Sequence, residues 1–541
     1  MKQTKRFASI ATAALLAACA VVPSMASIPA SAADTTYTIT INNDATGHTY
    51  EAYQIFSGSL GEGNTLGNIT WGVGVDTEAS GFLTAIQAVE DKDGKTPFAG
   101  KTTANDIAKI LGDNNTDATL ATNFASAVGK FLSATAQATQ AAQSDDSDGD
   151  EVKEYKLSGL NAGYYLVKDK NDTLAGKDDA YTSFIMKVVA NATATPKSAT
   201  PTVDKQVLDE TGDAEAGATE GWGESADHAI NESFQFKLTA TLPADTDFAS
   251  YDAYKVVFND TMSEGVTFEN IASVKVGNTE VQPTGYTSTA KANQAGGDWT
   301  LTIADIKQYV NDLSAGTTVE VVYNAHLNEK AVVSKANGTA LDVNNNKVNL
   351  EYSNNPNVTG GNELGKTTDD YVWVFTYEVD NTKVDQDKKP LADAGFKLYD
   401  STGTTEIGLT YDTTKAAYRP IAAGETATEM KSAASTGVFN IIGLDAGTYV
   451  LKETSTPAGY NTCDPIEIKI EATHVENANA TSADLTLTMT NGVNEIVNQK
   501  GSTLPSTGGI GTTIFYVAGG VLVVGAGVLL ITKKRAKNME A

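Results

Sequence analysis

The sequence contains very little cysteine. Of its 541 residues only Cys19 and Cys463 are cysteines, and Cys19 lies in an N-terminal apolar stretch that we expect to be removed on secretion. A large secreted chain with one remaining cysteine has no internal disulfide to stabilise it. We therefore expect the chain to depend on some other stabilising device.

Histidine and basic residues are also scarce. The formal net charge is −28, and the four histidines are His48, His228, His326 and His474. The histidines show no ligand spacing and no Cys–His pair exists for zinc, so we predict core or surface histidines, with no metal and no other cofactor. The acidic excess excludes nucleic acid and anionic lipid as partners and suits a surface outside the cell.

Residues 1–32 have the features of a secretory signal peptide. Lys2, Lys5 and Arg6 precede an apolar segment from Ile10 to Val22, and the small residues 30–32 provide a cleavage site. The tetrad that ends at Cys19 also satisfies a short lipobox pattern. A lipidated N-terminus is therefore an alternative, although it would duplicate the anchor found at the other end of the chain.

The C-terminal segment 501–541 contains three signals in a fixed order. It begins with Leu504, Pro505, Ser506, Thr507 and Gly508, continues with an apolar run over residues 514–531, and ends in a basic cluster. Eighteen helical residues span roughly 27 Å, which predicts a transmembrane helix whose basic end stays in the cytoplasm. The pentapeptide resembles the LPxTG sorting signal of Gram-positive surface proteins. That resemblance implies cleavage by a sortase between Thr507 and Gly508; the alternative is an ordinary single-pass anchor.

Alternating apolar and polar residues between these ends predict a mostly β fold. We expect tandem immunoglobulin-like β sandwiches: an N-terminal domain over residues 33–197, a middle domain over 198–366 and a C-terminal domain over 367–500. Alanine-rich segments at 78–89, 103–111 and 116–143 predict a helical insertion in the first domain. The acidic loop 144–151 lacks both anchoring acids of an EF-hand and is interpreted as a solvated loop.

An internal repeat relates the first domain to the third. Residues 157–169 match residues 441–453 almost position by position, which places Asp169 opposite Glu453. Residues 449–460 resemble the E-box of pilins and of collagen-adhesin B-type domains. In that family a first-strand lysine and a last-strand asparagine join through an isopeptide bond, with the E-box glutamate as catalyst. The resemblance implies Lys383, Asn498 and Glu453 in these roles.

The chemistry of such a bond follows from burial. A buried lysine loses its proton because desolvation disfavours its charge, and a buried carboxyl keeps its proton for the same reason. The neutral amine can then attack the amide while the acid polarises the carbonyl and transfers protons. The alternative is that the lysine, asparagine and glutamate are ordinary surface residues.

Each of the other domains differs from this pattern. In the second domain, residues 258–268 resemble the segment that supplies an aspartate in the middle domain of these pilins, which implies Asp260 as catalyst and Lys205 as amine. Strand alternation places Asn354 on the inward face, so we predict it as the acceptor. Between the signal peptide and Lys92 the first domain contains no lysine, and we predict no bond of this type there.

Residues 195–197 resemble the pilin motif, in which a lysine follows tyrosine and proline; here Thr195 replaces the tyrosine. The resemblance implies that Lys197 of one subunit attacks the sortase thioester at Thr507 of the next. We therefore interpret the chain as the major shaft subunit of a covalent, cell-wall-anchored pilus that supports adhesion, and not as an enzyme. Its expected partners are a pilus sortase, identical subunits, tip and base pilins, and peptidoglycan through a housekeeping sortase. The alternative is a monomeric wall-anchored adhesin of similar domains.

Overall fold

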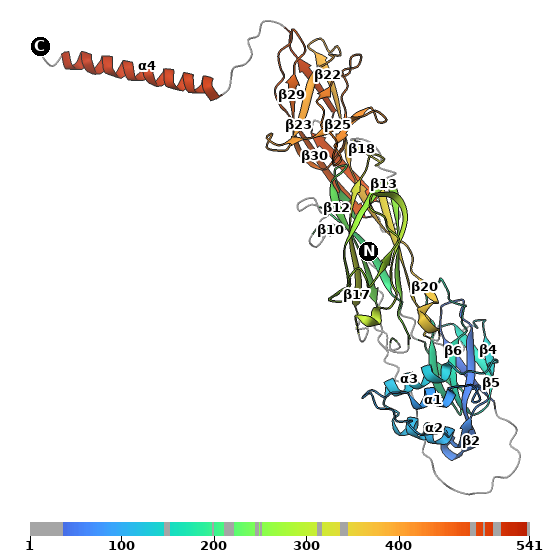
Figure 1. The fold of residues 1–541 in the computed structure, drawn as a ribbon. Helices are drawn as coiled ribbons and strands as arrows, with labels where there is room; N and C mark the ends of the chain where they lie inside the picture. The colour runs from blue at the N-terminus through green and yellow to red at the C-terminus, as the bar shows by residue number, and fades with distance from the viewer. Residues whose placement is uncertain are drawn as a thin grey trace.

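The computed structural model describes residues 36–144, 152–196, 200–209, 221–243, 248, 251–310, 316–335, 344–356, 358–476, 483–490, 493–500 and 510–537. Three β domains follow one another along an elongated molecule, and the helix α4 (Ile510–Lys537) lies apart from them (Figure 1). We call them the first, second and third domains. The signal peptide, the acidic loop 145–151, Lys197 and the sorting signal 504–508 all lie outside the described residues.

Two sheets and a helical layer form the first domain. One sheet has the order β5-β1-β8 and the other the order β3-β2-β6-β7, with β4 paired to β2. The strands are β1 (Tyr37–Asn42), β2 (Tyr50–Gly61), β3 (Thr65–Trp71), β4 (Ala138–Gln140), β5 (Glu154–Leu160), β6 (Gly163–Asp169), β7 (Ser183–Val188) and β8 (Ala192–Ala194). The first and last strands, β1 and β8, pair in parallel.

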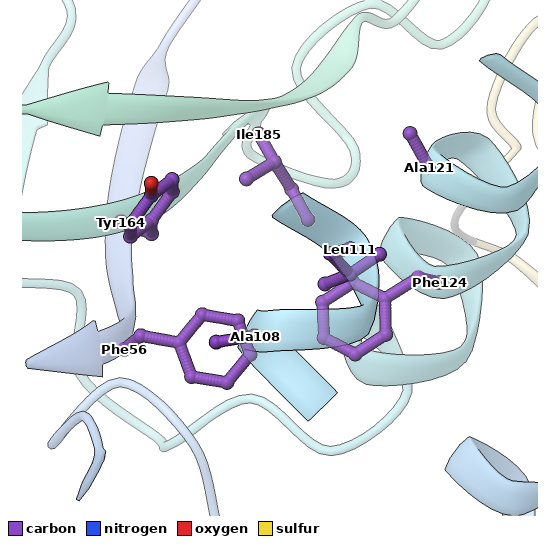
Figure 2. A pocket seen from close by; sticks show the side chains of 7 residues that line it. All are labelled: Phe56, Ala108, Leu111, Ala121, Phe124, Tyr164 and Ile185. Atoms are coloured by element: carbon purple, nitrogen blue, oxygen red, sulfur yellow. The ribbon is translucent and has the colours of Figure 1, made fainter. Parts of the chain in front are cut away.

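The predicted helical insertion is present as α1 (Phe82–Gln87), α2 (Ala104–Asp113) and α3 (Ala118–Gly129). Thr103 and Asp117 cap α2 and α3 by accepting hydrogen bonds from Asp106 N and Leu120 N. The third helix was predicted too long, because the chain after Gly129 turns back and forms β4 against β2. The helices cover the sheet that contains β2. Figure 2 shows a small apolar hollow between this sheet and the helices α2 and α3, lined by Phe56, Ala108, Leu111, Ala121, Phe124, Tyr164 and Ile185.

The second domain is built around the long strand β13, which pairs with β16, β17 and β19 and bends at several irregularities. Its other strands extend the sheet in the order β10-β9-β12-β17-β13-β19-β21-β11. The strands are β9 (Thr202–Leu208), β10 (Trp222–Gly223), β11 (Ser225–Asp227), β12 (Ser233–Leu242), β13 (Val256–Val276), β14 (Thr279–Glu280), β15 (Thr287–Ser288), β16 (Gln294–Ile303), β17 (Thr317–Leu327), β19 (Asn344–Ser353), β20 (Leu364–Lys366) and β21 (Asp370–Phe375). Short 3-10 turns lie at η1 (Glu62–Asn64) in the first domain and at η3 (Ile306–Gln308) and η4 (Thr359–Gly361) here.

The third domain is a sandwich of two sheets, β18-β22-β28-β26-β25 with β32 on β22, and β24-β23-β29-β30-β31 with β27 on β23. The strands are β18 (Ser334–Lys335), β22 (Tyr377–Asp385), β23 (Gly395–Tyr399), β24 (Glu406–Ile407), β25 (Leu409–Asp412), β26 (Ala417–Pro420), β27 (Met430–Lys431), β28 (Ile441–Leu444), β29 (Gly447–Ser455), β30 (Ile466–Glu476), β31 (Ala483–Thr490) and β32 (Val493–Asn498). Its first full strand, β22, and its last, β32, pair in parallel, as β1 and β8 do.

The boundary between the second and third domains lies later than the predicted 366/367. Strand β21 pairs with β19 and β11 of the second domain, and the chain enters β22 only after Thr376. Val372 and Val374 pack in the second core, while Trp373 and Phe375 pack in the third. This alternation follows from the two-residue period of a strand, so one strand is shared by two cores.

Within the part of the chain that is described, no helix is both long and apolar enough to cross a membrane.

Candidate functional site: two buried lysine clusters

Strands β22 and β32 bring Lys383 and Asn498 together in the third domain. The parallel register places Lys383 opposite Ile496 and Asp385 opposite Asn498, so the lysine side chain reaches along the partner strand. Its Nζ donates to Asn498 Oδ1 at 2.6 Å and to Ile496 O at 3.1 Å. Lys383 and Asn498 are both buried, at 0% and 1% exposure. The predicted amine and acceptor are therefore in contact.

Glu453, near the end of β29, completes this cluster. Its Oε1 accepts a hydrogen bond from Asn498 Nδ2 at 2.7 Å, and its Oε2 accepts one from the backbone N–H of Cys463 at 2.8 Å. Two details differ from the expectation. Glu453 is only partly buried, and it faces the amide nitrogen of Asn498 instead of the carbonyl oxygen.

Burial controls the protonation of this cluster. Desolvation lowers the pKa of Lys383, against the opposing influence of Cys463 and Glu453. Burial and the charge of Glu453 raise the pKa of the Cys463 thiol to about 12. The amine is thus closer to its neutral, nucleophilic form, while the adjacent thiol stays protonated and does not compete as a nucleophile.

The second cluster lies in the core of the second domain. Lys205 on β9 forms a fully buried ion pair with Asp260 on β13. Desolvation lowers the pKa of Lys205 and raises the pKa of Asp260, and the attraction between the two groups opposes both shifts. Tyr323 on β17 contacts both groups: Lys205 Nζ donates to its Oη at 3.2 Å, and Oη donates to Asp260 Oδ2 at 3.1 Å.

The predicted acceptor Asn354 is not at this cluster. It follows the end of β19, and its Nδ2 donates to the backbone oxygens of Leu174 and Asp179 in the first domain. The asparagine at the cluster is Asn346, eight residues earlier on β19, whose Nδ2 donates to Tyr323 Oη at 2.6 Å. Asn346 is fully buried, and its Oδ1 has no hydrogen-bond partner among the described residues. Asn354 is buried as predicted, but its side chain contacts the first domain and not the Lys205 cluster.

In the first domain, a histidine contacts the residue that aligns with Glu453. His48 Nδ1 lies 2.8 Å from Asp169 Oδ1, and His48 Nε2 lies 2.9 Å from Asp179 Oδ2. His48 is 1% exposed, and its imidazole stacks on Tyr50. Asp169 also accepts hydrogen bonds from the backbone N–H and hydroxyl of Thr182. Sequence reasoning missed this cluster because His48 lies in no recognised motif and was interpreted as an isolated core or surface histidine.

Three further potential ligands meet at the junction of the second and third domains. Ligand atoms of His228, Glu232 and Asp445 lie within 4.8 Å of one another. Each side chain also forms a hydrogen bond with a backbone group: His228 Nε2 donates to Leu208 O, while Glu232 and Asp445 accept from Ala229 N and Ala446 N. These contacts explain the grouping as part of the interface between the domains.

Family models match three segments of the chain. Residues 230–356 match the Gram-positive pilin backbone subunit 2, Cna-B-like domain; residues 378–484 match the SpaA prealbumin-like fold domain; and residues 496–538 match the LPXTG cell wall anchor motif. No curated protein sequence matches the chain significantly. The matched anchor and tandem β domains define a class, the cell-wall-anchored surface proteins of Gram-positive bacteria. Within this class the chain is a backbone pilin, the shaft subunit of a surface pilus.

Solved structures similar to the chain include three pilins. The T6 backbone pilin of serotype M6 Streptococcus pyogenes is 19% identical, with a TM-score of 0.47 over 87% of this chain and 100% of that one. The full-length major pilin SpaD from Corynebacterium diphtheriae is 15% identical, with a TM-score of 0.43 over 86% and 98%. The full-length major pilin RrgB from Streptococcus pneumoniae is 15% identical, with a TM-score of 0.39 over 87% and 100%.

Proposed function

We propose that this pilin is crosslinked at two levels. Lys383–Asn498 and Lys205–Asn346 isopeptide bonds form within each subunit, and sortase joins subunits head to tail from Lys197 to Thr507. The observation that carries the proposal is the contact between the buried Lys383 amine and Asn498, whose amide nitrogen faces Glu453. The arrangement holds the Lys383 amine, which is the nucleophile, and the Glu453 carboxyl, which can carry a proton, on the same side-chain amide of Asn498.

The third-domain reaction balances without a cofactor. The neutral Lys383 Nζ attacks Cγ of Asn498, the Cγ–Nδ2 bond breaks, and ammonia leaves. One proton must pass from Nζ to the departing nitrogen. Glu453 contacts that nitrogen and is therefore placed to deliver the proton. Each domain reacts once, so the subunit is a substrate of its own fold and not a turnover enzyme.

Strand pairing supports a mechanical role for this bond. Lys383 lies on the first full strand of the third domain and Asn498 on the last, and these strands pair in parallel. Tension that pulls the two ends of the domain apart would shear these strands past each other. A covalent bond between them would carry that tension directly.

The intramolecular bonds are tested by intact mass. A soluble protein of residues 33–500 should be lighter than its sequence mass by about 34 Da, because each bond expels one ammonia of about 17 Da. Lys383→Ala and Lys205→Ala should each remove one loss, and peptide mapping should recover Lys383–Asn498 and Lys205–Asn346 crosslinks. An unshifted parent mass would contradict both bonds.

Polymerisation is tested separately. Strand β8 lies at the edge of its sheet and is followed by Thr195, which is exposed, and Pro196. Lys197 is the next residue in the sequence. Wall extracts boiled in detergent should show a high-mass ladder, and Lys197→Ala should replace it with monomer that still reaches the wall. Lys187→Ala, on β7 of the same domain, is the matched control and should keep the ladder. A single band from the parent would favour the monomeric adhesin, and a normal ladder in Lys197→Ala would assign the role to another lysine.

A further inference from the structure

We propose that Tyr323 is a catalytic residue of the second-domain crosslink and relays the proton between Lys205, Asp260 and Asn346. This inference rests on the proposed Lys205–Asn346 bond. Its basis is that one phenolic hydroxyl touches all three groups: it accepts from Lys205 Nζ at 3.2 Å and from Asn346 Nδ2 at 2.6 Å, and it donates to Asp260 Oδ2 at 3.1 Å. A hydroxyl has one donor and two acceptor positions, and this one uses all of them.

Comparison of the two clusters shows what the hydroxyl contributes. In the third domain the carboxyl of Glu453 contacts the departing amide nitrogen directly. In the second domain the acid is aspartate, which is one methylene shorter, and the hydroxyl of Tyr323 stands between Asp260 and Asn346 Nδ2. Among the described residues, no tyrosine hydroxyl contacts Lys383, Glu453 or Asn498. Tyr323 therefore extends the reach of Asp260 to the leaving group.

The proton transfer balances through this hydroxyl. Because burial lowers the pKa of Lys205 and raises that of Asp260, the pair reacts in its neutral form, with the shared proton on Asp260. When Nζ of Lys205 bonds to Cγ of Asn346, the nitrogen gives up one proton to Tyr323 Oη, either directly or through Asp260. Tyr323 passes its own proton to Nδ2 as the Cγ–Nδ2 bond breaks, and ammonia leaves. Tyrosine and aspartate both end in the protonation state in which they began. Burial and the adjacent Asp260 raise the pKa of Tyr323 well above its ordinary value, so the hydroxyl stays protonated and can donate.

Aromatic rings fix the orientation of Tyr323. Its ring lies edge-on to Trp299 at 5.0 Å between centroids and tilted against Phe236 and Phe268 at 5.2 and 5.5 Å. Lys205 Nζ lies 5.2 Å from the Phe236 ring centroid and 5.4 Å from that of Tyr323. Lys205, Asp260 and Tyr323 are all buried, so we expect the proton to move through Tyr323 and Asp260 and not through bulk water.

The test uses the third-domain bond as an internal control. The three-domain chain, residues 33–500, is made by cell-free translation, sampled over time, and analysed by intact mass and peptide mapping. In Tyr323→Phe the Lys205–Asn346 bond should form at least tenfold more slowly, in line with the roughly 10²–10⁴-fold contribution of general acid–base catalysis. The Lys383–Asn498 bond in the same molecules should form at the parental rate.

Two variants separate catalysis from packing. Phe268→Leu alters a ring packed on Tyr323 but removes no polar group, so its second-domain bond should form at close to the parental rate. Adding Asp260→Glu to Tyr323→Phe lengthens the acid and should restore part of the lost rate. The relay is refuted if Tyr323→Phe reacts like the parent, if Phe268→Leu is equally slow, or if the longer acid gives no rescue. Absence of the Lys205–Asn346 peptide in the parent would instead overturn the proposed bond itself.

Discussion

Replacing His48 with glutamine should destabilise the first domain. The variant should also lose much less stability than the parent as the pH rises from 6.5 through 9. Burial by itself lowers the pKa of His48, but its hydrogen bonds to Asp169 and Asp179 outweigh that influence and raise the pKa to about 9. Tyr50 and Tyr155 are the other titratable groups against the ring, from β2 and β5. His48 is therefore a cation between two carboxylates at neutral pH.

The size of the effect follows from linkage. A rise in pKa from 6.5 to about 9 corresponds to about 3 kcal/mol of stability for the folded first domain. Because the folded pKa is the higher one, this contribution is fully present below pH 6.5 and is lost as the pH rises through 9. For a domain of this size the loss would lower the melting temperature by roughly 10 °C.

Two measurements check this reasoning on the soluble three-domain chain. Histidine ring resonances recorded from pH 5 to 10 should include one, absent in His48→Gln, that titrates near 9. Melting of the first domain should fall between pH 6.5 and 9 in the parent and change much less in His48→Gln. His326→Gln is the matched control, since His326 pairs with Glu269 at a partly exposed site. A His48 midpoint near 6.5, or identical pH profiles for parent and variant, would refute the charged clamp.

The remaining predictions concern the crosslinks. Glu453→Ala should leave the third domain folded with Lys383 and Asn498 both unreacted, and trypsin resistance should fall. By analogy with disulfides, losing a bond between residues 115 apart costs on the order of 4 kcal/mol; a Glu453→Ala protein with the parental mass loss would show that Glu453 is only structural. Asn346→Ala should lose one ammonia-sized mass shift, whereas Asn354→Ala should keep both shifts and loosen the contact between the first and second domains. A reversed outcome for these two asparagine variants would restore Asn354 as the acceptor.

Strand alternation predicts which face of a sheet a residue lies on, but not which residue of the neighbouring strand it is paired with. Asn354 was predicted to point inward from strand alternation alone, and Asn346 has the same parity on the same stretch of chain. The register that sets Asn346 beside Met262, two positions from Asp260, is a long-range pairing of β19 with β13. No local pattern encodes that register. Tyr323 was missed for the same reason, because its contacts depend on how β17 packs against residues of β9, β13 and β19.

In the third domain the residues that short sequence segments single out do lie in contact, while their roles in a crosslink stay predictions. The E-box fixes Glu453 at the end of β29, and parallel pairing of the first and last strands brings Lys383 to Asn498. The predicted domain boundary at 366/367 precedes β21, which is apolar on both faces and packs in the second core and in the third. A continuous apolar run does not reveal in which of two neighbouring domain cores its side chains pack.

The three domains differ in how they are clamped, and the proposed linkage gives a reason. Tension in a fibre joined from Lys197 to Thr507 would pass through the second and third domains, which contain the Lys205 and Lys383 clusters. The first domain precedes Lys197 and would lie outside that path, so it needs resistance to unfolding but not to pulling. The ion pairs of His48 with Asp169 and Asp179 stabilise this domain against unfolding without a covalent bond. The backbone oxygen of Asp179 also accepts a hydrogen bond from Asn354, so the ion pair with His48 also holds in place the segment by which the first domain contacts the second.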